Sequence, residues 1–233
     1  ANARLRLDEL LVERGLFASR SRARDAIERG TVTVDGSIAR KPGQAVASDC
    51  ALAIDDPAQA YVSRAALKLI AGLDHFDLAP NGLDCLDIGA STGGFTQVLL
   101  ERAFDRSIAS GQPVKPWSWA DTWPVARIEV KRIGARAIVL AGTSGQALAF
   151  GPGHLHRTAD VGERGVAVFA AHRDTHFRFL RDVTIGDVIE ITRADGRLYR
   201  YRADATSVVR DDAPGIGVES EGFELILATC WPF

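Results

Sequence analysis

The sequence contains no methionine and only three cysteines among its 233 residues. Cys50, Cys85 and Cys230 are far apart and odd in number, which excludes a disulfide framework and shows no metal-binding spacing. No apolar run approaches the ~18 residues that a membrane-spanning helix needs, and the first residues lack a signal-peptide pattern. These absences predict a cytoplasmic chain with no metal site.

A strong charge of either sign is also missing. The formal net charge is −2 and the pI is about 6.2, so the chain as a whole gives no argument for nucleic-acid binding. The hydrophobic content of 46% and charged content of 25% are ordinary for a globular protein. A length of 233 residues fits one large domain or two small ones, so the choice rests on motifs.

The first 60 residues carry the helix-end and turn signals of a small α+β domain. Ser19 and Gly30 are the start and stop signals of a helix over residues 20–29. Residues 31–34 alternate as a strand, and Asp35-Gly36 after them is a strong hairpin turn. Two further segments complete this region, namely a helix that ends at Gly15 and a strand over residues 51–54.

Basic side chains crowd this domain, and the candidate RNA contacts are Arg14, Arg20, Arg22, Arg24, Arg40 and Lys41. Arginines at a helix start beside a hairpin suit phosphate contacts on structured RNA, although composition alone favours a solvated helix face. The runs RLDELLV (6–12), ASRSRAR (18–24) and VTVDG (32–36) resemble the RNA-binding domain first seen in ribosomal small-subunit protein S-four. This resemblance implies an RNA-binding domain over residues 1–60.

A glycine-rich motif, DIGASTGGF at residues 87–95, lies between a predicted buried strand (83–88) and a predicted helix from residue 95 to about 106. An acid at a strand end followed by glycines lets backbone N–H groups approach a nucleotide-like ligand. The candidate cofactor residues are Asp87, Gly89, Ser91, Gly93 and Gly94. A single glycine loop is weak evidence, so a plain strand-to-helix turn is the alternative.

Together with YVSRAALKL at residues 61–69, this motif is similar to the hemolysin-A-type ribosomal RNA 2′-O-methyltransferases. The resemblance implies S-adenosylmethionine as cofactor and makes Lys68 the first lysine of a Lys-Asp-Lys-Glu set that activates a ribose hydroxyl. The strands that should carry the other three members do not follow in this sequence. Residues 61–104 therefore predict a truncated Rossmann-like βα unit, and methyl transfer is not expected.

A proline- and tryptophan-rich arm covers residues 105–124. After it, apolar and polar residues alternate, which is the pattern of β-strands. The tryptophans of the arm, Trp117, Trp119 and Trp123, are expected to pack against the next domain. Candidate strands follow at residues 125–130, 136–140, 166–171, 187–192, 198–203, 206–209 and 223–229. Short strands at this spacing predict an all-β barrel or sandwich over residues 125–233.

His172 and Cys230 each come directly after one of these predicted strands, where side chains from distant segments can meet at one rim. A thiolate is the nucleophile in acyl transfer, and a nearby imidazolium lowers the pKa of a thiol and can protonate a leaving amine. Taken singly, a cysteine is often a small core residue and a histidine a satisfied polar group. The pair is therefore a hypothesis that needs support from its surroundings.

Three runs supply that support: FGPGH (150–154), AHRDTHF (171–177) and LATCWPF (227–233). They resemble a sortase, of the subgroup typical of Gram-negative bacteria. Sortases are cysteine transpeptidases with an eight-stranded barrel, which cut a C-terminal sorting signal and pass the acyl group to an amine. The resemblance implies Cys230 as nucleophile and His172 as acid/base, without a cofactor. His154 and His176 receive no catalytic role, and Asp174 is expected to orient the turn after His172.

Two departures from the sortase pattern stand out. The resembled enzymes hold the oxyanion with an arginine on the strand after the cysteine, whereas this sequence stops three residues past Cys230. A barrel without its last strand and an impaired enzyme are expected, because such a donor is worth about 3 kcal/mol. Arg173, Arg178 and Arg181 are candidates to replace it, and the sequence does not choose among them. The resembled enzymes also face outside the cytoplasm on a membrane anchor, whose place the methyltransferase-like piece takes here.

The sequence thus predicts a mixed fold, with a small α+β domain and a truncated Rossmann-like unit in front of a sortase-type barrel that lacks its last strand. The leading function is a sortase-like cysteine transpeptidase acting on a protein with a C-terminal sorting signal. The alternative is a truncated S-adenosylmethionine-dependent methyltransferase that still binds ribosomal RNA. A third interpretation is that the halves have no joint function, in a misjoined reading frame or a designed sequence.

Overall fold

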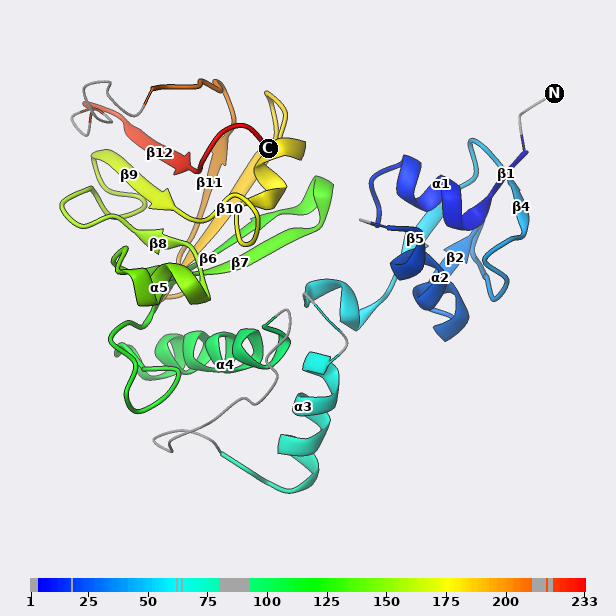
Figure 1. Cartoon of the computed structure of the whole chain (residues 1–233), viewed down its shortest axis with the longest axis horizontal. Helices are drawn as coiled ribbons and strands as arrows, with labels where there is room; N and C mark the ends of the chain where they lie inside the picture. The colour runs from blue at the N-terminus through cyan, green and yellow to red at the C-terminus, as the bar shows by residue number, and fades with distance from the viewer. Residues whose placement is uncertain are drawn as a thin grey trace. The chain divides into compact units, whose positions relative to one another are not determined.

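The computed structural model describes residues 4–17, 19–61, 63, 65–79, 93–210, 217 and 220–233. The chain divides into two compact units, Ala1–Gln59 and Ala60–Phe233, shown in blue to cyan and in cyan to red (Figure 1). The strand predicted over residues 83–88 lies outside the described residues, as do Asp87, Gly89 and Ser91.

The amino-terminal unit combines two short helices with two small antiparallel sheets. Its elements are β1 (Arg4–Arg6), α1 (Leu7–Glu13), α2 (Arg20–Arg29), β2 (Val32–Val34), β3 (Ser37–Ile38), β4 (Ala45–Ala47) and β5 (Leu52–Ile54), followed by a 3-10 turn, η1 (Pro57–Ala60). One sheet pairs β1 with β4, and the other has the order β3-β2-β5. Leu7, Leu11, Ile27 and Val32 are fully buried between helices and strands, so this small α+β domain has its own core.

Local signals explain the boundaries of α2 and of the hairpin after it. The Ser19 hydroxyl accepts a hydrogen bond from the Arg22 N–H at the helix start, and Gly30 ends the helix with φ +76°. Asp35 and Gly36 both have positive φ, which the tight turn between β2 and β3 requires. The predicted helix over residues 20–29 and the predicted hairpin are confirmed.

The carboxy-terminal unit begins with two helices and continues as a sheet. The elements are α3 (Ala65–His75), α4 (Gly94–Ser110), β6 (Pro124–Val130), η2 (Lys131–Ile133), β7 (Ala135–Ala141), α5 (Gly145–Phe150), β8 (Gly153–His154), β9 (Gly165–Ala170), η3 (Arg178–Asp182), β10 (Val188–Arg193), β11 (Leu198–Arg202) and β12 (Phe223–Ala228). The sheet order is β11-β10-β6-β7-β8-β9-β12. None of the helices in the described ranges combines the length and apolar character that crossing a bilayer requires.

This seven-stranded sheet curves around one core, which makes it barrel-like (Figure 1). Ile128 of β6, Phe169 of β9 and Ile191 of β10 are buried at its centre. Side chains from the two edge strands, Tyr199 of β11 and Leu225 of β12, pack against that same core. Both edges therefore bend toward a common interior, as an all-β barrel requires.

Helix α4 covers the outer face of β6 and β7 through a buried ionic network. The Glu101 carboxylate accepts hydrogen bonds at 2.7 Å from both Arg127 on β6 and Arg136 on β7. Burial opposes the charge of Arg127, but Glu101 and Asp105 outweigh it and raise the pKa of this guanidinium. Phe104 lies beneath the same guanidinium, 4.6 Å from ring centroid to carbon.

The tryptophan-rich arm joins this layer through one of its three rings. Trp117 is buried with Leu100 and Ile138, and its ring meets Phe150 at 4.8 Å in an edge-on contact. Trp119 keeps 52% of its surface exposed. The expected packing of the arm against the β domain is thus carried mainly by Trp117.

Some predicted elements differ from the structure. Residues 206–209 form no strand, because the β-branched run lies in the open with Val208 and Val209 63% and 71% exposed. Several short elements, among them α5 and β8, have no counterpart in the sequence predictions, since six and two residues are too few to set a period.

Candidate active site

The site predicted at His172 and Cys230 is positioned by two neighbouring parallel strands. β9 and β12 pair in register, with Ala170 opposite Ala228. His172 and Cys230 each lie two residues beyond that pair, and the carboxyl ends of parallel strands meet at one edge of a sheet. Both residues are exposed to solvent.

Hydrogen bonds continue past the strand ends and hold the two exits together. The Ala171 N–H donates to the Ala228 carbonyl at 3.2 Å, and the Thr229 hydroxyl donates to the Ala171 carbonyl at 2.8 Å. These bonds fix the residues directly before His172 and Cys230. His172 and Cys230 therefore follow neighbouring residues that are hydrogen-bonded to each other at the end of the sheet.

A buried phenylalanine anchors the turn after His172. The Phe177 N–H donates to the His172 carbonyl at 3.2 Å, and the Phe177 ring is fully buried in the barrel core. Asp174, expected to orient this turn, pairs its carboxylate with Arg173 at 3.0 Å. Hydrogen bonds from Arg173 lower the pKa of Asp174.

The other two histidines make local contacts. Nε2 of His154 contacts the Ala159 carbonyl at 3.0 Å and the Thr158 hydroxyl at 3.1 Å, and its ring meets Phe169 edge-on. His176 lies near the Ala149 carbonyl of α5 at 3.5 Å, and burial lowers the pKa of its imidazole. The absence of a catalytic role for His154 and His176 stays a prediction.

Three of the candidate RNA contacts in the amino-terminal unit, Arg14, Arg20 and Arg22, bond to other residues of the unit. Arg14 donates to the carbonyls of Ser48 and Cys50, while Arg20 pairs with Asp8 and Glu9 of α1 at 3.0 and 2.9 Å. Burial opposes ionisation of Asp8, but hydrogen bonds from Arg6 and Arg20 outweigh it and lower the pKa of this carboxyl. Arg22 donates to the Ala58 carbonyl at 3.4 Å. Arg24, Arg40 and Lys41 are exposed, as are Arg14 and Arg20, whereas Arg22 is half-buried.

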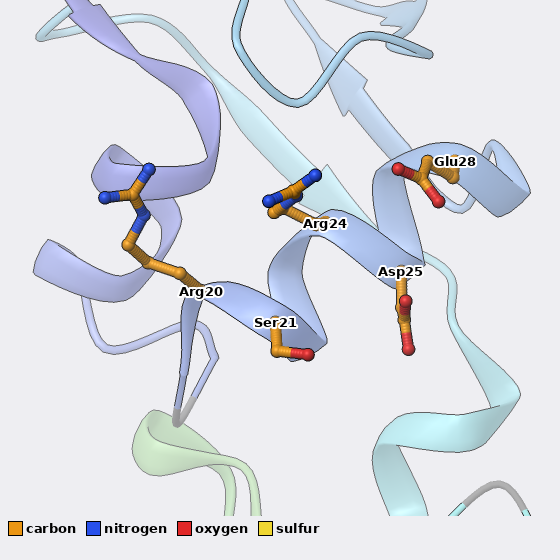
Figure 2. Close-up of a pocket in the computed structure, with 5 residues that line it drawn as sticks. All are labelled: Arg20, Ser21, Arg24, Asp25 and Glu28. Carbon is orange, nitrogen blue, oxygen red and sulfur yellow. The ribbon is translucent and has the colours of Figure 1, made fainter.

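A surface pocket of about 300 Å³ lies along α2 (Figure 2). Arg20 and Arg24 project from one side of the helix, as residues four apart do. Ser21, Asp25 and Glu28 complete the lining, so two carboxylates accompany the two cations. This pocket is not a purely positive surface.

Of the predicted cofactor loop, the structure describes only Gly93 and Gly94 at the start of α4. Gly93 has φ +80°, and a side chain on Gly94 would collide with the Ser63 hydroxyl. Lys68 is exposed on α3. The other residues of this loop lie outside the described ranges, so S-adenosylmethionine as cofactor stays a prediction.

Comparison with known families divides the chain in the same order. Residues 5–49 match the S4 domain, residues 61–117 the FtsJ-like methyltransferase, and residues 128–233 the sortase domain. The methyltransferase match runs through α4, although that helix packs on strands β6 and β7.

Individual relatives agree with these matches. The 16S/23S rRNA (cytidine-2′-O)-methyltransferase TlyA of Mycobacterium tuberculosis is 40% identical over 136 residues, which are 58% of this chain and 51% of that protein. Sortase D of Bacillus subtilis is 34% identical over 107 residues, 46% of this chain and 54% of the relative. The chain therefore spans about half the length of these curated relatives.

A solved sortase D5 transpeptidase of Clostridium perfringens is 20% identical, with a TM-score of 0.48 over 61% of this chain and 91% of that one. The Gram-negative subgroup inferred from the motifs stays a prediction. The chain is a chimera, in which an amino-terminal half similar to TlyA-type ribosomal RNA methyltransferases precedes a carboxy-terminal half similar to sortases.

Proposed function

We propose that the carboxy-terminal unit is a sortase-like cysteine transpeptidase. The observation that carries this proposal is the pairing of β9 with β12, which brings His172 and Cys230 out at one edge of the barrel-like sheet. The sulfur of Cys230 attacks the scissile carbonyl of a sorting signal and forms a tetrahedral oxyanion. Collapse breaks the peptide C–N bond while His172 gives a proton to the leaving amine, and a thioester remains on the enzyme.

The second half-reaction returns the enzyme to its starting state. An incoming amine attacks the thioester carbonyl, loses a proton to His172, and expels the thiolate of Cys230. The new amide bond joins the sorted protein to its acceptor. The proposed substrates are therefore a protein with a C-terminal sorting signal and a primary amine.

Alkylation of the cysteines tests whether this site is assembled. Cys230 should react with iodoacetamide rapidly at neutral pH or below, and His172→Ala should remove that behaviour because the imidazolium no longer favours the thiolate. Peptide mass mapping between pH 5 and 9 gives the rate at each cysteine. Cys50 is the internal reference, since its side chain is buried and burial raises the pKa of its thiol.

An ordinary pH profile at Cys230, unchanged in His172→Ala, would contradict the proposed site. In that case the two residues share an edge of the sheet without acting on one another.

RNA binding by the amino-terminal unit is the second candidate function, favoured by the S4 match over residues 5–49. The exposed cations Arg24, Arg40 and Lys41 are the proposed phosphate contacts. Arg14 and Arg20 bind within the domain, so their loss is expected to disturb its packing as well.

Single alanine substitutions at Arg24, Arg40 and Lys41 should each weaken binding to a ribosomal RNA fragment. Each lost phosphate contact should reduce the slope of log affinity against log salt by about 1. Fluorescence anisotropy across a salt series measures both effects. The matched control is Arg197→Ala, whose side chain is 75% exposed in the other unit. If all four variants bind the RNA fragment with equal affinity, these cations are ordinary surface charges that do not contact RNA.

A further inference from the structure

Arg173 directly follows His172, and its guanidinium reaches the segment that follows Cys230. Nη1 donates to the carbonyl oxygen of Pro232 at 2.6 Å, which joins positions 59 residues apart. Nε and Nη2 donate to the two carboxylate oxygens of Asp174 at 3.0 and 3.1 Å. Each guanidinium nitrogen therefore has a partner, and the planar guanidinium group is held between the turn after β9 and the segment after β12.

The charged groups that act directly on this guanidinium are Asp174 and Cys230. Asp174 also interacts with His172 and Arg178, and His172 interacts with His176. The hydrogen bond with Asp174 raises the pKa of Arg173, and negative charge on the sulfur of Cys230 acts in the same direction. The hydrogen bond to Pro232 keeps this permanent positive charge two residues along the chain from Cys230.

We propose that Arg173 is the positioning residue of the Cys230 site, where it ties the backbone after the cysteine to the turn after the histidine and holds a permanent positive charge near the sulfur. This inference rests on the proposed function, since it requires Cys230 to act as a thiolate. Among the described residues, Arg173 is the one of the three candidate arginines with a hydrogen bond to residues 228–233. Arg181, by contrast, pairs with its neighbour Asp182 at 3.3 Å.

The experiment compares the pH profile of Cys230 alkylation in the full chain with those of Arg173→Gln and Arg173→Lys. Loss of the charge should move the midpoint of the profile up by about 0.5 to 1 pH unit, so alkylation at pH 6.5 slows by about three- to tenfold. The lysine variant should restore most of the parent profile because it retains the charge. Arg181→Gln is the matched control, since it removes a similar local arginine–aspartate pair, and its profile should equal the parent's.

Each outcome bears on one of the two proposals. A shifted profile in His172→Ala together with an unchanged one in Arg173→Gln would overturn the role of Arg173 and leave the proposed function standing. An ordinary, unshifted profile in the parent itself would overturn both. A lysine variant that behaves like the glutamine variant would overturn the charge effect. Tryptophan fluorescence verifies folding. If Arg173→Gln does not fold, Arg173→Met replaces it, because it keeps an apolar stem of similar length while removing the charge, and a shift in the same direction is expected.

Discussion

Replacing Cys230 by alanine is expected to abolish cleavage of sorting-signal peptides, with a loss of at least about a thousandfold. The reason is that removal of a covalent nucleophile leaves only binding and oxyanion stabilisation. A library of peptides with varied C-terminal pentapeptide motifs, with hydroxylamine as the acceptor amine, allows cleavage and hydroxamate formation to be read by mass spectrometry. The parent chain should also accumulate a thioester on the peptide that contains Cys230.

His172→Gln should lower the same activity by about a hundred- to ten-thousandfold, as expected for the loss of a general acid and base. The control is Cys50→Ala, which removes a thiol buried in the amino-terminal unit and should leave cleavage unchanged. Undiminished cleavage in Cys230→Ala would end the transpeptidase proposal. Loss of cleavage in Cys50→Ala would mean that the reactive thiol is Cys50 of the amino-terminal unit and not Cys230.

Replacing Glu101 by alanine is expected to destabilise the carboxy-terminal unit by about 3 kcal/mol. Glu101 is the shared partner of Arg127 and Arg136, and its removal leaves two largely buried guanidinium groups without that carboxylate. Nε of each of these arginines is already buried without a partner in the described part of the chain. Remaining partners would not compensate both charges.

Urea unfolding followed by tryptophan fluorescence measures this loss. All four tryptophans lie in the carboxy-terminal unit, so the signal reports that unit alone. Asp105→Ala is the matched control on the same helix, because its carboxylate also binds Arg127 but is 64% exposed. An exposed pair of this kind should contribute less than about 1 kcal/mol. Equal, small effects of the two substitutions would show that Glu101 does not fasten α4 to the sheet.

The elements with strong local signals could be predicted from the sequence. Ser19 and Gly30 mark the ends of α2, and the alternating pattern over residues 125–130 predicts β6 to within one residue. The strand predicted over residues 206–209 was wrong, because a β-branched run carries no information about whether a partner strand lies beside it.

The candidate site could be predicted only in part. Placing His172 and Cys230 at strand ends follows from hydrophobic runs that precede each of them. The parallel pairing of β9 with β12 is a contact between segments 58 residues apart, which no local pattern encodes. The role of Arg173 was equally out of reach, since it depends on the carbonyl of Pro232.

Helix α4 has a consequence for where the two similar halves of the chain can meet. By sequence it falls within the methyltransferase match, yet its inner side chains Leu100 and Phe104 seal apolar surface on β7 that would otherwise meet water. A junction between the two halves that still allows folding must provide such a cover, with an acid on the helix to neutralise the two arginines. Without α4, the apolar surface of β7 would be exposed and would favour aggregation.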